Sequence, residues 1–494
     1  MELKDFRKEL DSLDKELTML FVRRLSISGQ IGEYKREHGL PVLDAKRETE
    51  KLMALEKLCP EEYRGEVRAL YQRIFELSRE LQERRSEAMR CGLLGRKLGH
   101  SYSPLIHGKL APYRYELFER EPEELEDFLQ QGEWQGLNVT IPFKKTVLGY
   151  CDELSDSARE IGSVNTLLRR ADGTLYGDNT DAFGFATLLQ KSSIDPAGKK
   201  ALVLGSGGAS VMACWVLRKL GAREVLVISR SGENNYGNLD RHADAELIVN
   251  TTPVGMYPNN GEAPLDLREF PSCSGVVDVV YNPARTALLL QAEELGIPFA
   301  GGLRMLVAQA KRSAEIFTGA AVPDDRIDDI SRELSREMEN IVLIGMPGCG
   351  KSKLAALLGA RLGRQVLEAD EEIVRQAGTS IPEIFREEGE KGFRRRETAV
   401  LRELGKRSGC VISTGGGCVT REENYALLHQ NGVIFWRQRD LKLLSRKGRP
   451  ISQSRDLAEL YAERAPLYAR FADHVIKETD SIEEAAEMIL EVLR

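Results

Sequence analysis

The chain contains 494 residues and has a mass of 55.3 kDa, and at roughly 150 residues per domain this length predicts about three domains. Hydrophobic residues make up 42% and charged residues 30% of the sequence, which is too apolar for a disordered protein. The 70 basic and 77 acidic residues give a net charge of −7, which argues against a nucleic-acid-binding protein that relies on bulk positive charge but leaves room for a local basic site.

Nothing in the sequence indicates secretion or membrane insertion. The first residues, MELKDFRKEL, are charged from the second position and lack the apolar core of a signal peptide. The longest apolar runs, such as Gly275–Tyr281, are too short to cross a bilayer. The eight cysteines are scattered without a CxxC pair, which is typical of reduced thiols and gives no metal-site spacing. We therefore expect a cytoplasmic protein that binds neither membrane nor nucleic acid.

Residues 1–88 are predicted to form an all-α domain of three helices. They contain almost no Gly or Pro, and apolar residues from Leu3 to Phe21 recur every three or four positions. A second helix is expected after Pro41 and a third over Glu61–Arg85. This pattern alone also fits a helical bundle with a solvated, charged surface.

The charged residues of the first helix fall on two faces. At 100° per residue, Arg24 and Lys35 lie about 20° apart, whereas Arg7 lies about 100° from Arg24. On one straight helix, Arg7 therefore cannot easily serve the site that Arg24 and Lys35 serve. Farther along, Asp44 with Glu48 and Ser78 with Gln82 are pairs four residues apart, so each pair shares a helix face.

The order of residues in FRKELDSLDKEL, VRRLSISGQIGEYK, LPVLDAKRE and FELSRELQ resembles the all-α class of chorismate mutase. The resemblance implies an intertwined homodimer, in which the first-helix arginine reaches the partner's site, in agreement with the offset of Arg7. It implies that Lys35 and Gln82 stabilise the ether oxygen as its bond breaks. The chorismate-binding positions would be Arg7, Arg24, Lys35, Asp44, Arg47, Glu48, Ser78 and Gln82. A dimerising or chorismate-sensing domain without turnover is the alternative.

Residues 91–322 are predicted to form a two-lobed α/β domain with parallel sheet. Short β-rich runs alternate with helical stretches, at Cys91–Leu94, Gly136–Thr140, Ala201–Leu204, Glu224–Ile228, Leu247–Asn250 and Gly275–Val280. We expect a substrate lobe over residues 91–190, a nucleotide lobe over residues 191–300, and a return to the first lobe over residues 301–322.

The turn GSGGAS at residues 205–210 follows a predicted strand and precedes a predicted helix. Pyrophosphate can bind at such a helix N-terminus, although an ordinary tight strand–helix turn has the same sequence pattern. The next strand ends in Ser229-Arg230-Ser231, where an arginine suits the 2′-phosphate of NADP; the alternative is an ordinary exposed arginine.

Together, HSYSP, NVTIPFK, GSVNTL, GDNTD, GSGGAS, NTTPVGM and GGLRMLVAQA resemble shikimate dehydrogenase over residues 91–322. The resemblance implies that Lys144 and Asp181 form the acid–base pair for reduction of 3-dehydroshikimate with NADPH. The implied substrate positions are Ser101, Ser103, Asn138, Thr140, Lys144, Asn165, Asp181 and Gln309, and the implied NADP positions are Gly205, Gly207, Gly208, Ala209, Ser210, Arg230 and Thr252. Quinate is the alternative substrate.

The nucleotide lobe departs from a regular pattern after Arg230. Only about fifteen residues separate Arg230 from the strand at Leu247, where a full strand–helix step needs more. We therefore expect one peripheral helix or strand of this lobe to be missing, which weakens the prediction of NADP selectivity.

Residues 323–339 are predicted to form a helical linker, and residues 340–494 a second α/β domain. The run Gly345–Ser352 fits GxxxxGKS, follows a predicted strand at Asn340–Ile344 and precedes a helix expected from Lys353. In such a phosphate-binding loop (P-loop), backbone N–H groups cradle phosphates, Lys351 reaches the β- and γ-phosphates, and Ser352 ligates Mg²⁺.

Downstream, LEAD, EEGEKGFRRRE, STGGG, GRPIS and ERAPLY resemble shikimate kinase. The resemblance implies a shikimate pocket of Asp370, Arg394, Gly416, Gly417 and Arg464, with Asp370 as candidate base. It implies an ATP site of Gly345, Gly348, Cys349, Gly350, Lys351, Ser352 and the lid arginine Arg449, whose alternative is a surface arginine. Glu368 stands where many relatives have Asp and is a second metal candidate, and the lid looks short.

These three resemblances follow one another along the chain. They imply a multidomain, trifunctional enzyme of aromatic amino-acid biosynthesis with NADP(H), ATP and Mg²⁺ as cofactors. Its substrates would be 3-dehydroshikimate, shikimate and chorismate, and it would be a homodimer through the helical domain. One domain could instead be an inactive scaffold, although no loss of a catalytic residue supports that reading.

Overall fold

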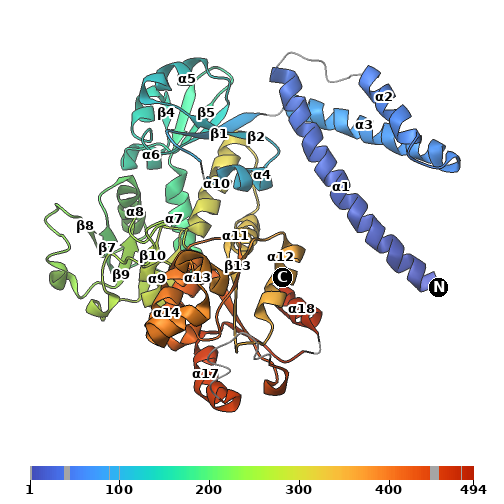
Figure 1. Cartoon of the computed structure of the whole chain (residues 1–494). Coiled ribbons are helices and arrows are strands. Elements are labelled where there is room, and N and C mark those ends of the chain that lie inside the picture. Colours follow the sequence, from blue (N-terminus) through green and yellow to red (C-terminus); the bar gives the residue numbers. More distant parts are fainter. Residues whose placement is uncertain are drawn as a thin grey trace. The chain divides into compact units, whose positions relative to one another are not determined.

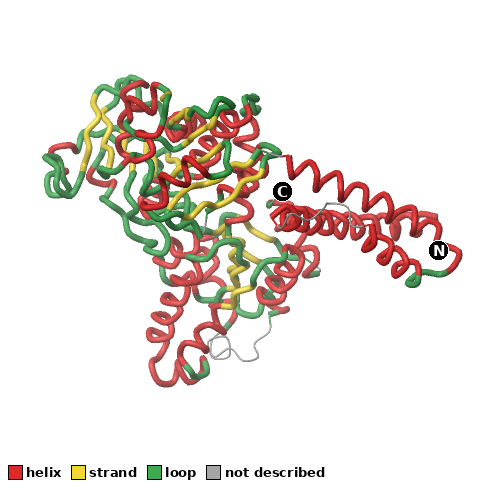
Figure 2. Tube along the Cα trace, turned by 90° about the horizontal axis from the view of Figure 1, so that it is seen from above, coloured by secondary structure: helices red, strands yellow, loops and turns green. Residues whose placement is uncertain are grey.

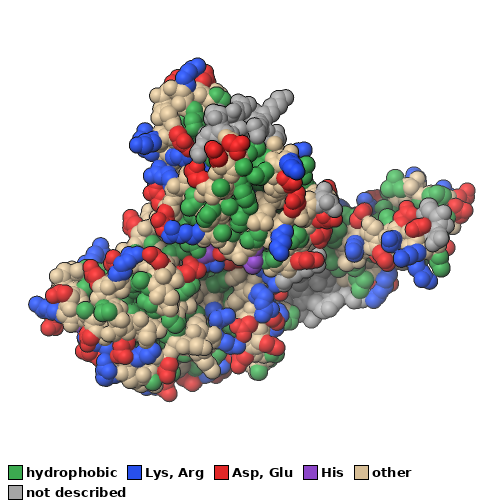
Figure 3. Space-filling view, turned by 90° about the horizontal axis from the view of Figure 1, so that it is seen from below, with side chains coloured by type: hydrophobic (Ala, Val, Ile, Leu, Met, Phe, Trp, Pro, Cys, Tyr) green, Lys and Arg blue, Asp and Glu red, His purple; other side chains and the backbone are tan. Residues whose placement is uncertain are grey.

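The computed structural model describes residues 3–37, 45–87, 89–99, 101–444, 456–479 and 481–493. The chain forms two compact units: Met1–Glu153 with Thr166–Tyr176, and Leu154–Asn165 with Gly177–Arg494. No helix in the described ranges is both long and apolar enough to cross a membrane. On the face drawn in Figure 3, acidic and basic side chains are interspersed, as the nearly balanced charge suggests.

The first unit begins with the expected helices (Figures 1 and 2). They are α1 (Leu3–Glu37), α2 (Ala45–Glu56) and α3 (Arg64–Glu87), with a short 3-10 turn η1 (Glu61–Tyr63) before α3. Helix α3 packs against both α1 and α2. Helix α1 runs unbroken for 35 residues, and many of its apolar side chains are exposed: Leu3, Phe6, Leu10, Leu13, Leu17 and Leu20 are each more than half exposed.

The substrate lobe of this unit is built on strands β1 (Arg90–Gly95), β2 (Arg114–Glu119), β3 (Gly136–Val139) and β5 (Thr166–Arg169), in the order β2-β1-β3-β5. Strand β1 is parallel to β2 and β3, and β3 is antiparallel to β5. Helices α4 (Ser103–Leu110) and α5 (Leu125–Gln131) and the 3-10 turns η2 (Pro122–Glu124) and η3 (Thr146–Tyr150) connect them. The boundary between the units passes through β4 (Glu153–Leu154) and β6 (Leu175–Asp178).

The nucleotide lobe lies in the second unit and has a parallel five-stranded sheet in the order β11-β10-β9-β7-β8. Its strands are β7 (Lys200–Leu204), β8 (Glu224–Ile228), β9 (Leu247–Asn250), β10 (Gly275–Asp278) and β11 (Phe299–Gly301). Around it are α6 (Asp156–Ile161), α7 (Thr180–Lys191), α8 (Gly208–Lys219), α9 (Ala287–Glu294), α10 (Leu303–Thr318) and the 3-10 turn η5 (Leu267–Glu269). Only the 3-10 turn η4 (Leu239–His242) lies between β8 and β9, where the short spacing after Arg230 predicts that a helix or strand is missing. Strand β8 is at the edge of the sheet.

The carboxy-terminal α/β domain, called the kinase domain from here on after the family that its motifs resemble, also lies in the second unit, on a parallel five-stranded sheet in the order β13-β14-β12-β15-β16. Its strands are β12 (Asn340–Ile344), β13 (Val366–Glu368), β14 (Val411–Ser413), β15 (Gly432–Arg437) and β16 (His474–Ile476). Its helical elements are α12 (Lys351–Leu362), α13 (Ala369–Ala377), α14 (Ile381–Gly405), α15 (Glu423–His429), α17 (Leu457–Phe471), α18 (Ile482–Val492), η6 (Cys418–Thr420) and η7 (Leu441–Leu443). Strand β12 is fully buried at the centre of the sheet, so the loop that follows it opens at the sheet's carboxyl edge.

The predicted linker contains an ordered helix, α11 (Asp325–Met338), that is attached on both sides. It packs against α10, and its Asp328 accepts from Lys191 Nζ of α7 at 2.7 Å. At its other end, the Met338 carbonyl accepts from the Gly409 N–H at 2.7 Å, and the Glu339 carbonyl accepts from Arg364 Nη1 at 2.8 Å. The nucleotide lobe and the kinase domain are thus joined by a packed helix.

The same two domains also meet through a buried histidine. His429, at the end of α15, is 2% exposed at its side chain; its Nε2 lies 3.2 Å from Glu293 of α9 and its Nδ1 lies 3.4 Å from Asp473, which precedes β16. Burial lowers the pKa of His429, but the carboxylates of Asp473 and Glu293 outweigh it and hold the pKa above its ordinary value. The other ionisable groups acting at this cluster are Arg285, Glu339 and Tyr425.

We expect this histidine to make the stability of the second unit depend on pH. Because the folded pKa is raised, the stabilisation is complete below the unfolded value of about 6.5 and is lost as the pH rises through the folded value. The midpoint of thermal unfolding should therefore fall over this range for the native chain and fall less for His429→Gln. The exposed His474 provides the control, and a His474→Gln variant that flattened the slope equally would contradict the assignment.

Candidate active sites

The P-loop of the kinase domain is formed by glycines in unusual backbone conformations. Gly345, Gly348 and Gly350 have φ angles of +143°, +85° and +94°, which L side chains rarely adopt. Lys351 begins α12, two residues before the predicted start, and is only 7% exposed. Its Nζ donates to the carbonyls of Gly345 at 2.8 Å and Met346 at 3.2 Å, so the ammonium is already held over the loop.

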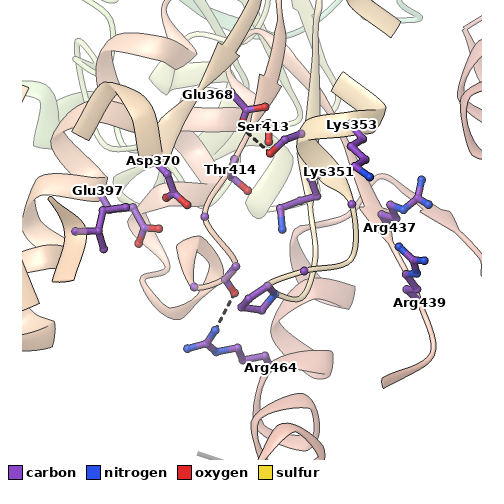
Figure 4. Close-up of a pocket in the computed structure, with 18 of the residues that line it drawn as sticks. Lys351, Lys353, Glu368, Asp370, Glu397, Ser413, Thr414, Arg437, Arg439 and Arg464 are labelled. Atoms are coloured by element: carbon purple, nitrogen blue, oxygen red, sulfur yellow. Dashed lines mark hydrogen bonds between the residues drawn. The ribbon is translucent and has the colours of Figure 1, made fainter. Parts of the chain in front are cut away.

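A cavity of about 660 Å³ extends from this loop across the carboxyl edge of the sheet (Figure 4). One end is lined by acidic and basic side chains from α13, α14 and α17, and the other by side chains that follow β15 and precede α18. In Figure 4, Lys351 points into the space between these two ends. The P-loop lysine therefore faces one continuous cavity that has charged side chains at both ends.

Two buried arginines meet the backbone of residues 416–417 at the first end. Arg464 is 2% exposed, and its Nη1 donates to the Gly416 carbonyl at 3.0 Å. The guanidinium of Arg394 lies against Gly417 so closely that a Cβ there would come within 2.1 Å of Nη2. A side chain at 417 would therefore displace the Arg394 guanidinium, and the two predicted arginines are brought to one pocket suited to a carboxylate.

Glu397 is a pocket residue that closes the motif EEGEKGFRRRE and to which the sequence analysis assigned no role. It is completely buried, and its Oε2 accepts from Arg394 Nη1 at 2.7 Å. A Cβ at Gly415 would lie 2.6 Å from Glu397 Oε1 and 3.0 Å from Asp370 Oδ1, so both carboxyl groups flank this glycine. Burial raises the pKa of Glu397, and Arg394 opposes that rise. The spacing of three residues from Arg394 within a helical run was the signal that could have identified it.

Ser352 and Glu368 form a second polar pair beside the P-loop. Ser352 Oγ donates to Glu368 Oε2 at 3.1 Å, as drawn in Figure 4. Burial raises the pKa of Glu368, while hydrogen bonds from Ser413 and Ser352 lower it. Among the described residues no cluster of three or more His, Cys, Asp or Glu side chains could hold a metal ion, so a cation here would need oxygen ligands from elsewhere.

Two further arginines, absent from the motif analysis, line the opposite end. Arg437 ends β15, is 4% exposed, and donates from Nε to the carbonyl of the P-loop residue Cys349 at 2.8 Å. Arg439 lines the same end with Thr479 and Ser481. The predicted lid residue Arg449 lies outside the described residues.

In the first unit, four predicted substrate residues follow strands β1 and β3 or lie on them. Ser101 and Ser103 follow β1, and Ser103 begins α4 and donates from its backbone to Ser101 Oγ at 3.2 Å. Thr140 follows β3, and Asn138 on β3 accepts from Tyr115 Oη at 2.8 Å and donates to Thr166 at 3.1 Å. Because β1 and β3 are parallel, the residues after their carboxyl ends share one sheet edge.

Lys144 lies at this edge in the turn after β3. The neighbouring Phe143 is 2% exposed and anchors the turn, while Lys144 itself is half-buried and Lys145 is exposed. The buried Phe143 ring thus fixes the turn, while the side chain of Lys144 stays partly accessible to solvent.

The predicted partners in the second unit gather around α7 and α10. Asn165 Oδ1 accepts from the N–H of Thr180 at 2.7 Å, and Asp181 lies next, in the first turn of α7. Gln309 of α10 packs against Gly184, where a Cβ would come within 3.0 Å of its own Cβ. Lys144 and Asp181 lie in different units, so their pairing stays a prediction.

The turn between β7 and α8 has the features of a dinucleotide site. Gly205 has a φ angle of +109°, Gly207 caps α8, and a Cβ added at Gly207 or Gly208 would meet nothing within 4 Å, which leaves the backbone open to a ligand. Ala209 follows in the first turn, Ser210 is 1% exposed, and Thr252 lies against Gly205. Arg230, after β8, is exposed.

The helical domain brings together part of its predicted site. Arg24 Nη1 of α1 donates to Ser78 Oγ of α3 at 2.8 Å, and its guanidinium lies 5.4 Å from the centre of the Phe75 ring. Burial lowers the pKa of Arg24. Glu48 instead accepts from Arg79, at 2.6 Å.

The remaining predicted residues of this domain differ in their exposure. Lys35 is half-buried, whereas Arg7 and Arg47 are exposed. Asp44 lies outside the described residues, as does the side chain of Gln82. Arg7 is seventeen residues from Arg24 on the continuous helix α1, a separation of about 25 Å.

Comparisons with known proteins agree with the three blocks seen in the sequence. Family models match residues 6–83 as chorismate mutase type II, residues 93–167 as shikimate dehydrogenase substrate binding domain, and residues 347–494 as shikimate kinase. The shikimate dehydrogenase (NADP(+)) of Clostridium perfringens is 34% identical over 264 residues, which cover 49% of this chain and 97% of that protein. That of Caldicellulosiruptor bescii is 37% identical over 246 residues, covering 44% of this chain and 85% of the relative.

Among solved structures, a chorismate mutase/shikimate 5-dehydrogenase fusion protein from Clostridium acetobutylicum is 36% identical, with a TM-score of 0.48, and covers 50% of this chain and 97% of its own. The near-complete coverage of the Clostridium perfringens relative, at this level of identity, identifies the middle of the chain. The chain belongs to the shikimate dehydrogenase family, and segments matching the type II chorismate mutase and shikimate kinase families flank its dehydrogenase region.

Proposed function

We propose that the chain is a multifunctional enzyme of the shikimate pathway that reduces 3-dehydroshikimate with NADPH, phosphorylates shikimate with ATP, and rearranges chorismate to prephenate. The observation that carries the proposal is the kinase cavity, in which the P-loop lysine lies between an end lined by acidic residues and arginines and an end lined by two further arginines. One preparation of the full chain, assayed with each substrate in turn, tests it. Absence of turnover in any one assay would remove that activity from the proposal.

For phosphoryl transfer, Arg394 and Arg464 would hold the carboxylate of shikimate beside residues 416–417. Asp370 would accept the proton of the attacking hydroxyl, which bonds to the γ-phosphorus of ATP as ADP leaves. Lys351 supports the transfer because its buried ammonium, held by two carbonyls, offsets the negative charge on the phosphates. The arginines 437 and 439 would accommodate the nucleotide at the other end.

Ser352 and Glu368 are the residues that we propose to hold Mg²⁺, Glu368 through water. Hydroxyl and carboxylate oxygens are the ligands this ion prefers, and the two side chains already lie within hydrogen-bonding distance. When bound, the ion would neutralise charge on the ATP phosphates.

For the reduction, NADPH would supply hydride to the carbonyl carbon of 3-dehydroshikimate. Lys144 would deliver a proton to the carbonyl oxygen, with Asp181 as its acid–base partner. Ser101, Ser103, Asn165 and Gln309 would orient the substrate's hydroxyl and carboxylate groups. The open turn at residues 205–208 supports binding of the pyrophosphate, and Arg230 would meet the 2′-phosphate.

The rearrangement of chorismate needs no nucleophile, only a site that holds a dianion in a compact conformation. Arg24 supports this role because it is partly buried and its guanidinium is fixed by Ser78 and the Phe75 ring. Lys35 and Gln82 would stabilise negative charge on the ether oxygen as its bond breaks.

We further propose that the helical domain forms a homodimer in which Arg7 completes the partner's site. Within one chain, Arg7 is about 25 Å from Arg24 along α1, too far to share a ligand. The exposed leucines of α1 form an apolar surface of a kind that is usually covered by a partner. A second copy of α1 would cover it and bring in Arg7.

A complementation experiment tests the shared site. Arg7→Ala and Arg24→Ala should each lower prephenate formation on the order of 10²-fold, because each removes a charged contact to the substrate. If the two variants are unfolded and refolded together, half of the dimers become heterodimers with one intact site, so about a quarter of the activity should return. Arg23→Ala, on an exposed position beside Arg24, is the control.

Two results would count against this arrangement. If the refolded mixture regains no activity, the two arginines act in the same chain. A native chain that bound prephenate without converting chorismate would make the helical domain a sensor.

We also propose a reducing, cytoplasmic location. The eight cysteines are all free, and five of them are buried, which supports a compartment where disulfides do not form.

A further inference from the structure

The loop 282–286, between β10 and α9 of the nucleotide lobe, is held by the kinase domain where α15 ends and β15 begins. The Ala284 N–H donates to Asn431 Oδ1 at 2.8 Å, and the Arg285 N–H donates to the Gln430 carbonyl at 2.8 Å. Arg285 Nη1 also donates to the His429 carbonyl at 3.0 Å. Asn431 is 3% exposed, so water cannot easily replace its bond to the loop.

The hydrogen bonds continue from this loop into the core of the nucleotide lobe. Thr286, the residue after Arg285, donates from Oγ1 to Asp278 Oδ2 at 2.7 Å. Asn250 Nδ2 donates to both carboxylate oxygens of Asp278 at 3.1 Å. All three side chains are at most 1% exposed. Such a buried network keeps one geometry because every broken bond leaves a polar group without water.

The network ends at the glycine-rich turn. Asn250 Oδ1 accepts from the N–H of Thr252 at 3.0 Å and from its hydroxyl at 2.6 Å. A Cβ at Gly205 would lie 3.0 Å from Thr252 Cγ2 and 2.9 Å from Thr251 Oγ1, so these threonines pack directly on the first glycine of the turn. An unbroken series of contacts therefore joins residues 429–431 of the kinase domain to the glycine-rich turn of the nucleotide lobe.

We propose that Asn431 of the kinase domain is a positioning residue for the dehydrogenase. It fixes loop 282–286 and, through Thr286, Asp278 and Asn250, sets the position of Thr252 against the turn that receives NADPH. The kinase domain thereby contributes to NADPH affinity without touching the cofactor. This inference rests on the proposed NADPH-dependent reduction.

The test uses the full chain and Asn431→Ala. NADPH binding is followed by cofactor fluorescence, and both reduction and phosphorylation are measured at steady state. We expect the Kd and KM for NADPH to rise about tenfold, because the Ala284 N–H loses its buried acceptor and the loop relaxes. The kcat for reduction and the KM for 3-dehydroshikimate should change little. Shikimate phosphorylation should be unchanged, which shows that the kinase domain is folded.

A matched pair on the other side of the interface tests the route. Thr286→Val removes the hydroxyl that bonds Asp278 and should raise the Kd for NADPH to a similar extent, whereas Thr286→Ser keeps that hydroxyl and should behave like the native chain. Since both residues act through one network, the double variant Asn431→Ala with Thr286→Val should have a Kd for NADPH no higher than that of the single variant with the higher Kd.

Three outcomes would overturn the proposal: unchanged NADPH affinity in Asn431→Ala, a parallel fall of reduction and phosphorylation, or full additivity in the double variant. Failure of the native chain to bind NADPH at all would be a different result. It would overturn the proposed function, and this inference with it.

Discussion

Replacing Lys351 with alanine is expected to lower kcat for shikimate phosphorylation on the order of 10³-fold. The ammonium of Lys351 is buried and held beside the P-loop by the carbonyls of Gly345 and Met346, so its charge lies where the phosphates of ATP would bind. Alanine removes that charge and leaves the loop carbonyls without their donor. A coupled assay of ADP release measures the loss.

Lys353 provides the control for this variant. It is exposed, two residues farther along α12, and it also lines the cavity. Lys353→Ala removes the same charge from the cavity wall but not from the loop, and should lower kcat less than about tenfold. Equal losses in the two variants would mean that general positive charge, and not the held ammonium, drives the transfer. Reduction and prephenate formation should be unaffected in both.

Replacing Lys144 with alanine is expected to lower kcat for reduction of 3-dehydroshikimate by about 10²- to 10⁴-fold, the range of general acid–base catalysis. The turn that carries Lys144 is anchored by the buried Phe143, so the variant should fold and bind NADPH normally. Consumption of NADPH, followed by absorbance, measures the rate.

The adjacent Lys145 is a matched control, since it carries the same charge on the same turn but is exposed. Lys145→Ala should retain nearly full activity. A Lys144→Ala variant within tenfold of the native rate would contradict its role as proton donor. Loss of phosphorylation as well would mean that the domains do not function independently.

The strands of the second unit illustrate what the sequence can predict. The predicted runs Glu224–Ile228, Leu247–Asn250 and Asn340–Ile344 coincide with β8, β9 and β12. Buried parallel strands are short apolar runs between turn residues, so their signal is entirely local. The P-loop is equally local, because glycines at fixed spacing and one lysine define it.

Residues whose role depends on distant partners were not predictable in this way. Glu397 of α14 and Arg437 at the end of β15 both line the kinase cavity; Glu397 closes the motif EEGEKGFRRRE without a role being assigned to it, and Arg437 belongs to no quoted motif. Asn431 and Ala284 are 147 residues apart, and nothing in either local sequence indicates their hydrogen bond. The pairing of Lys144 with Asp181 is likewise a matter of tertiary geometry, and the sequence alone only suggests it by resemblance.

The packed helix α11 also limits where the gene could be divided. A kinase translated separately from Asn340 would deprive the Gly409 N–H of its acceptor on Met338 and Arg364 of its acceptor on Glu339. Either fragment would expose surface that the intact polypeptide conceals. These bonds favour translation of the two domains as one chain. The cell must then make the reductase and the kinase in equal numbers, whatever the relative demand for their two products.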